Sequence, residues 1–157
     1  MRRTLLNLSI ACGLAVGTLP ALADQTIVLP DLAATHYVPA PSSLPKGRTI
    51  SMVQGDPAKP GPFVLRLIFP AHTVIEPHTH SADENLTILS GSIYHEVGPT
   101  VDKSQGKLVK TGGFVYLPAN TPHSLWTADE PVELQVTGTG PFGLHYVHPA
   151  DDPSHKS

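Results

Sequence analysis

The sequence has almost no cysteine and no long helical pattern, and both absences restrict the class of protein. Its one cysteine, Cys12, lies in a segment that we expect to be removed. The mature chain would then have neither a disulfide bond nor thiolate chemistry. Seventeen prolines and thirteen glycines interrupt the chain. No stretch of about twelve residues keeps a 3.6-residue apolar period, so long helices are excluded.

The chain also lacks a basic stripe. Its formal net charge is −3, and loss of Arg2 and Arg3 with the N-terminal segment would make it about −5. A mildly acidic chain without clustered lysine and arginine is a poor candidate for binding nucleic acid. We therefore expect no nucleic-acid partner.

The N-terminus has the features of a secretory signal peptide over residues 1–23. Arg2 and Arg3 precede an apolar run, residues 5–22, and the segment ends in Ala-Leu-Ala. A transmembrane anchor is the alternative, but two glycines and a proline break the run, which is short for a span. Cleavage would leave 134 residues without a stable membrane anchor, enough for one domain. We expect export to a periplasm or to the outside.

Seven short runs are typical of β-strands and are separated by turn sequences. They cover residues 49–53, 63–69, 85–89, 92–97, 113–117, 123–126 and 132–137. In the last run Val132, Leu134 and Val136 alternate with polar residues, which indicates a half-buried strand. The pattern predicts an all-β sandwich or barrel.

The chain divides by composition into an irregular arm, a β-rich core and a polar end. Residues 24–60 hold six prolines, and we interpret them as an N-terminal arm that wraps the barrel and could reach a neighbouring subunit. Residues 61–147 form the predicted barrel. Residues 148–157 form a polar C-terminal tail, which we expect to be loosely held.

Three possible metal ligands stand close together in the stretch PHTHSADENLTILSG. His78, His80 and Glu84 have the same parity in one apparent strand, so their side chains would share a face. Two imidazoles spaced this way are roughly 6.5 to 7 Å apart at Cα and can bind one ion. The alternative is an exposed histidine pair with an exposed glutamate. The apolar residues of the following strand argue against that alternative, because that strand has a buried face.

A second stretch, GGFVYLPANTPHSLW, runs from a glycine through a proline-rich turn to a histidine. The two stretches together resemble the cupin superfamily, whose motifs are G(X)5HXH(X)3,4E(X)6G and G(X)5PXG(X)2H(X)3N. The matching positions are His78, His80, Glu84 and Gly91 in the first motif and Gly112, Pro118 and His123 in the second. The resemblance covers residues 61–147 and implies a double-stranded β-helix, or jelly-roll barrel. It also implies that His123 completes a site of three histidines and one glutamate.

Three positions depart from the motifs. His72 replaces the first glycine, Asn120 replaces the turn glycine, and Thr127 replaces the final asparagine. Asparagine tolerates positive φ better than most residues, and position 127 is not a ligand position. His72 is either a solvated loop residue or a fifth imidazole near the rim.

Three imidazoles and one carboxylate suit one divalent transition metal ion, namely Fe, Mn, Cu, Ni or Zn, and suit Ca or Mg poorly. A six-coordinate ion with four protein ligands keeps two open positions, which favours a reacting metal over a structural one. Sequence alone does not choose a nearby base. The candidates are Tyr94, His95, Glu133, Gln135 and His145.

Cupins include dioxygenases, decarboxylases, lyases, isomerases and non-catalytic proteins, so the resemblance implies several functions. We expect a metal-dependent enzyme, a dioxygenase-type oxidoreductase, that acts on a small organic molecule by oxygen-dependent oxidation or C–C cleavage. A non-catalytic exported cupin that captures a metal ion or a small ligand is the alternative. A sensor domain would need a partner, because no DNA-binding segment accompanies the core. Small cupins commonly pair, so a homodimer is expected.

Overall fold

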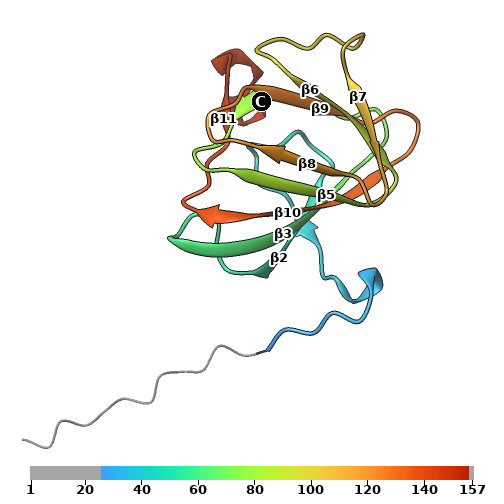
Figure 1. The fold of residues 1–157 in the computed structure, drawn as a ribbon, viewed down its shortest axis with the longest axis vertical. Helices are drawn as coiled ribbons and strands as arrows, with labels where there is room; N and C mark the ends of the chain where they lie inside the picture. The colour runs from blue at the N-terminus through green and yellow to red at the C-terminus, as the bar shows by residue number, and fades with distance from the viewer. Residues whose placement is uncertain (1–25, 156–157) are drawn as a thin grey trace, which may run out of the picture.

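The computed structural model describes residues 26–155, which form two antiparallel sheets that face each other (Figure 1). The larger sheet has six strands in the order β1-β2-β3-β10-β5-β8. Their bounds are Val38–Pro39, Thr49–Gln54, Gly61–Phe69, Val132–Gly140, Glu84–Ser90 and Phe114–Leu117. The predicted signal peptide, residues 1–23, lies outside the described residues.

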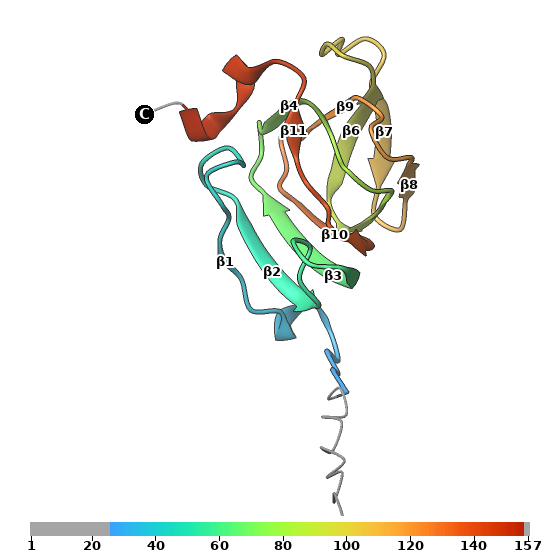
Figure 2. The ribbon, with the colours of Figure 1, turned by 90° about the vertical axis from the view of Figure 1, so that its left-hand side faces the viewer.

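The smaller sheet has five strands in the order β11-β4-β9-β6-β7. Their bounds are His145–Tyr146, Val74–Thr79, His123–Trp126, Ser92–Val97 and Lys107–Lys110. Figure 2 shows β1 to β3 on one side of the molecule and β4, β6, β7 and β9 on the other. Because β10 lies between β3 and β5, strands from both ends of the chain interleave in one sheet. The fold is an all-β jelly-roll barrel, as predicted.

All seven predicted strands are present. The bounds of β6 and β9 are as predicted, and the other five differ by up to three residues. The seven predicted runs did not include β1, β4, β7 or β11, although β4 overlaps the apparent strand in which His78 and His80 were placed. Strand β7 is mostly exposed on both faces, so its sequence KLVK carries no alternation of buried and exposed residues.

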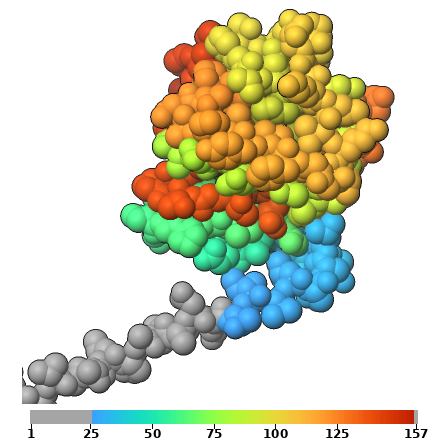
Figure 3. All heavy atoms as spheres, viewed as in Figure 1, coloured from blue at the N-terminus to red at the C-terminus, as the bar shows by residue number. Residues whose placement is uncertain are grey.

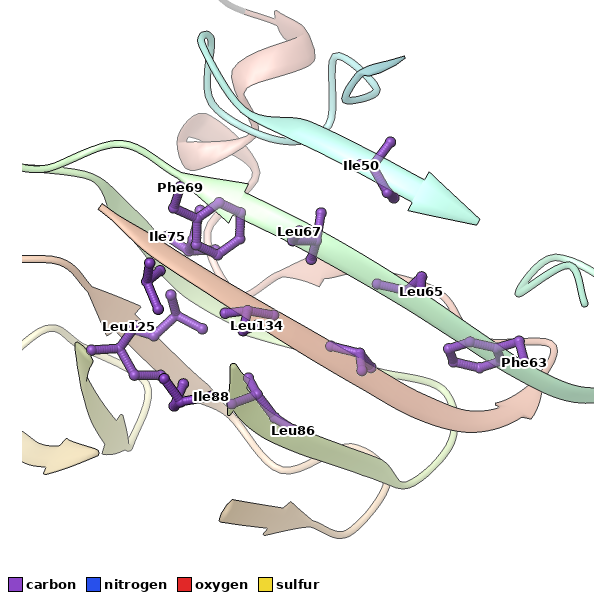
Figure 4. Packing of buried hydrophobic residues seen from close by; sticks show 13 residues of the cluster. Ile50, Phe63, Leu65, Leu67, Phe69, Ile75, Leu86, Ile88, Leu125 and Leu134 are labelled. Carbon is purple, nitrogen blue, oxygen red and sulfur yellow. The ribbon is translucent and has the colours of Figure 1, made fainter. Parts of the chain in front are cut away.

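The inner faces of the two sheets form the hydrophobic core. Val132, Leu134 and Val136 on β10 are buried, whereas Glu133 and Gln135 between them are half-buried, which confirms the predicted alternation. Figure 4 shows aliphatic side chains of β3, β5 and β10 gathered with Ile75 and Leu125 of the opposite sheet. Burial of these side chains holds the two sheets together.

The segment predicted as an arm begins outside the barrel and then joins it. Figure 3 shows the first described residues, in blue, projecting beyond the edge of the barrel. Farther along, the Tyr37 hydroxyl donates to Glu133 on the outer face of β10. Strand β1 then pairs with β2, and β2 pairs with β3 of the same chain.

The C-terminal tail is more regular than expected, because residues 149–151 and 153–155 each form a short 3-10 turn. Within residues 26–155, no helix is both long enough and apolar enough to cross a membrane.

Candidate metal centre

The chain crosses from one sheet to the other between His80 and Glu84. Sequence analysis placed His78, His80 and Glu84 in one strand, and that prediction is wrong. His78 lies in β4 of the smaller sheet, His80 directly follows that strand, and Glu84 begins β5 of the larger sheet. The three side chains still meet because both strands line the same interior. Asp83 fixes the crossing, since its carboxylate accepts from the Tyr116 hydroxyl and from a backbone N–H at residue 119.

His123 comes from β9, the strand next to β4. It lies directly opposite His78 in the β4–β9 pair, where the register shifts between Ile75 and His78. Pro77 falls within that shift, as expected for a residue without a backbone donor. The shift brings the His78 and His123 rings next to each other, with centroids 4.1 Å apart and planes tilted by 54°.

The four predicted residues are brought together in the interior. Ligand atoms of His78, His80 and His123 lie within 4.8 Å of one another. The Glu84 carboxylate lies 3.7 Å from His80 Nε2 and 3.5 Å from His123 Nε2. The side chains are buried, with the four residues between 1% and 6% exposed. The alternative of an exposed histidine pair is therefore wrong.

Backbone carbonyl groups set the tautomer of each imidazole. Nδ1 of His78 lies 2.7 Å from the carbonyl oxygen of residue 76, Nδ1 of His80 lies 2.7 Å from that of Gly143, and Nδ1 of His123 lies 3.1 Å from that of residue 121. A carbonyl oxygen only accepts, so each Nδ1 must carry the proton and donate. In each neutral ring the lone pair is then on Nε2, the atom available to a metal.

Burial favours the neutral form of every ionisable group here. It lowers the pKa of His80 to about 4, and it lowers the pKa of His78 and His123 as well. Burial raises the pKa of Glu84 to about 7. Glu84 and its histidine neighbours are therefore not an ordinary ion pair at neutral pH, despite their short distances. Neutral imidazoles are the form that binds a metal ion.

Two buried atoms at the centre have no hydrogen-bond partner in the described part of the chain: Glu84 Oε2 and His123 Nε2. A buried polar atom without a partner is destabilising by about 1–3 kcal/mol. A cation at this position would satisfy both atoms at once. Three nitrogen donors and one carboxylate also match the preference of divalent transition metals. The residues therefore fit a metal ion.

Of the five candidate bases, the structure places one beside the centre. His95 on β6 is buried, its ring stacks 5.4 Å from that of His123, and its Nε2 has no partner among the described residues. Tyr94 instead stacks on Trp126. Glu133 and Gln135 bond to Tyr37 and Arg66, and His145 contacts Ser81.

The segment GTGPFG, residues 138–143, covers the end of β10 and the chain that follows it, and it supports His80. The Phe142 ring stacks on the His80 imidazole, with centroids 4.2 Å apart and planes 14° apart. The carbonyl of Gly143 accepts from the same imidazole. An aromatic residue between glycines was the available signal, although it does not indicate which side chain it would contact.

The three departures from the motifs are all accommodated. His72 is exposed, with φ of 57°, and it faces Asp129 on the surface, so it is a loop residue rather than a fifth imidazole. Asn120 has φ of 61°, and its N–H donates to the carbonyl of His80. Thr127 is buried and accepts from the N–H of Thr73.

The chain belongs to the cupin family. The family model described as "Cupin domain" matches residues 65–150, more than half of the chain. No curated protein matches the sequence.

Several solved structures share the fold. The polyketide cyclase RemF from Streptomyces resistomycificus is 17% identical with a TM-score of 0.64, covering 82% of this chain and 91% of that one. A protein of unknown function with a cupin-like fold from Ralstonia eutropha JMP134 is 19% identical with a TM-score of 0.60, covering 79% of each chain. The DMSP lyase DddQ from Ruegeria pomeroyi DSS-3 is 19% identical with a TM-score of 0.55, covering 69% of this chain and 58% of that one. Cupins of this fold therefore include enzymes.

Proposed function

We propose that this cupin is a metal-dependent enzyme that acts on a small organic molecule. The observation that carries the proposal is the convergence of three Nδ1-protonated imidazoles, with Nε2 of His80 and His123 within 3.7 Å of the partnerless carboxylate oxygen of Glu84. These residues also border a cavity: His78, His80 and Glu84 line it. A molecule in the cavity would thus meet the ligand atoms directly. A bound divalent ion would supply Lewis-acid or electron-transfer chemistry there.

The reaction that we propose is oxygen-dependent oxidation or C–C cleavage with Fe, Mn, Cu or Ni. Zn, the remaining candidate, has no redox chemistry and would act only as a Lewis acid. In this site the protein would bind the ion, burial keeps the imidazoles neutral, and the cavity wall is mostly apolar. A cyclase and a lyase share the fold, so ring closure and elimination belong in the same test. The assay therefore follows both oxygen uptake and substrate loss under nitrogen.

The test is turnover by metal-loaded protein compared with the variant His123→Ala. Loss of one of four ligands should weaken metal binding by more than about 100-fold, since even outer partners contribute 10- to 100-fold. Elemental analysis should show metal in the wild type and in the control His36→Ala, whose histidine is exposed. Turnover that persists in metal-free His123→Ala would refute a metal-dependent reaction.

A non-catalytic cupin that captures a metal ion or a small ligand is the second candidate. It is favoured by one observation: among the described residues that line the cavity, the titratable side chains are those of His78, His80 and Glu84. No further acid or base in the lining is placed to move a proton. Tight metal binding with no turnover under air or nitrogen would support capture over catalysis.

We also propose that the protein is exported after cleavage behind residue 23 and that it forms a homodimer. Export is supported by the basic and apolar composition of residues 1–23. The homodimer is supported by the frequent dimerisation of small cupins. Light scattering of the purified protein tests the dimer, and a monomeric mass would rule it out.

A further inference from the structure

The cavity beside the metal centre is apolar along nearly its whole wall. Leu65, Leu67, Leu134 and Val136 of the larger sheet line it, with Leu125 of the smaller sheet. Figure 4 shows Leu65, Leu67, Leu125 and Leu134 between the sheets. The polar side chains are confined to Ser43 and the three site residues. A molecule in this cavity therefore meets polar atoms mainly at the end formed by His78, His80 and Glu84.

The wall contains no charge that could pair with a charged substrate. No lysine, arginine or aspartate is among the described lining residues, and the one carboxylate is that of Glu84. A carboxylate or phosphate held against this wall, away from both the metal and the half-exposed Met52, would be buried without a partner, which is strongly unfavourable. An ammonium group would meet the same obstacle. Negative charge is acceptable only on the atoms that bind the metal.

The volume limits the size of the occupant. The cavity measures about 170 Å³, whereas pockets for drug-sized molecules measure about 300–1,000 Å³. An apolar cavity of about 150 Å³ lined by similar side chains binds benzene. One aromatic ring, or an aliphatic group of equal size, therefore fills the space.

Building on the proposed metal-dependent function, we propose that the substrate is an apolar molecule of single-ring size. It carries one or two oxygen donors at one end, as in a phenol, a catechol or an enolisable ketone, and no charge elsewhere. The oxygen end lies at His78, His80 and Glu84, and the ring lies among the leucines. Carboxylic acids, amino acids and sugar phosphates whose charge would lie against the apolar wall are excluded, and a three-ring molecule would extend beyond the cavity.

Matched probes test this specificity through binding rather than through activity. Protein loaded with Co(II) is titrated anaerobically at pH 8 with catechol, 4-methylcatechol and 3,4-dihydroxybenzoate, and the visible cobalt spectrum is followed. The methyl group should improve affinity by about 3- to 4-fold, the effect of one more buried carbon. The added carboxylate should weaken affinity by at least about 100-fold, because it has no partner in the wall.

A charge variant tests whether the wall itself is responsible. Met52 lines the cavity and is half exposed, so lysine can replace it without burying its ammonium group in the core. Met52→Lys should reduce the preference for catechol over 3,4-dihydroxybenzoate by at least about 10-fold relative to the control Met52→Leu. Cobalt binding should be the same in both variants, because Met52 is not a ligand. An unchanged preference would overturn the assignment of the wall.

The outcomes separate the substrate class from the metal site. If cobalt binds and the acid binds as tightly as catechol, the substrate class is wrong and the metal site stands. If no cobalt spectrum forms, the proposed function fails, and toluene still tests the cavity in metal-free protein. Toluene has no donor atom, so a rise in melting temperature supports an apolar cavity of this size, whereas no rise overturns it.

Discussion

Replacement of Glu84 by glutamine should make the metal-free protein more stable while it weakens metal binding. The Glu84 carboxyl is buried, and its Oε2 has no hydrogen-bond partner in the described residues. The nearby Nε2 atoms of His80 and His123 carry lone pairs, so they do not stabilise a carboxylate. A glutamine side chain is uncharged, so its burial carries no cost of removing a charge from water, and its NH2 group can donate to those nitrogens.

The magnitude follows from the pKa. Burial raises the pKa of Glu84 from 4.5 to about 7, which corresponds to about 3 kcal/mol at 1.36 kcal/mol per pKa unit. Because the folded pKa is the higher one, the unfolded chain loses its proton first as the pH rises. The free energy of unfolding therefore falls between pH 4.5 and pH 7 and stays low above pH 7. Glu84→Gln should raise it by about 3 kcal/mol at pH 8 and by only about 1 kcal/mol at pH 5.

Urea denaturation with a chelator, at pH 5 and pH 8, measures this difference. At pH 8 the gain should shift the melting temperature by on the order of 10 °C. The control is Glu76→Gln on β4, a half-buried glutamate whose replacement should change stability by less than about 0.5 kcal/mol. With metal in about 1,000-fold excess over its dissociation constant, wild type should gain about 4 kcal/mol, and the order of stability should reverse.

If Glu84→Gln were no more stable than wild type at pH 8, the buried carboxylate of Glu84 would not be destabilising. A gain of equal size at both pH values would point to amide hydrogen bonds rather than to ionisation. Failure of the order to reverse with metal would contradict the assignment of Glu84 as a ligand.

Three further changes test the turn that follows β5, the buried threonine beside the β3–β4 turn and the N-terminus. Gly91→Ala should destabilise the fold by more than about 2 kcal/mol, because Gly91 has φ of 73° and a Cβ would lie 2.2 Å from the carbonyl oxygen of Pro131. The midpoint of denaturant unfolding measures this loss, and an unchanged midpoint would contradict the close approach. Thr127→Val should lower the free energy of unfolding by about 1–3 kcal/mol, because it leaves the N–H of Thr73 without its acceptor at 2.8 Å. In the same denaturation curves the control Thr127→Ser should be close to wild type. Intact-mass analysis of protein from an exporting host should find a chain that begins at Asp24, and retention of Met1 would contradict cleavage.

Local pattern was enough to predict seven of the eleven described strands, whereas His123 was assigned to the centre through the resemblance to the cupin motifs. Strand β10 was evident because its alternation of buried and exposed residues depends only on its own sequence. Local pattern could not predict that the chain crosses from one sheet to the other between His80 and Glu84. The sequence of residues 80–83 is compatible with either a strand or a turn. Which sheet a strand joins depends on pairing with β9 and β8, far along the chain.

The imidazoles of this centre are oriented by backbone carbonyl groups, which is why the sequence motifs identify the ligands but not the groups that orient them. Each Nδ1 donates to a backbone carbonyl, those of residues 76, 121 and 143. Any residue type supplies a carbonyl, so selection for the tautomer places no restriction on the amino acid at those positions. The motif positions that did change, His72, Asn120 and Thr127, lie in turns or beside them and leave all four ligands in place. In this chain the turns depart from the motifs while the ligand atoms of the three histidines stay together, with Nε2 of His80 and His123 beside the Glu84 carboxylate.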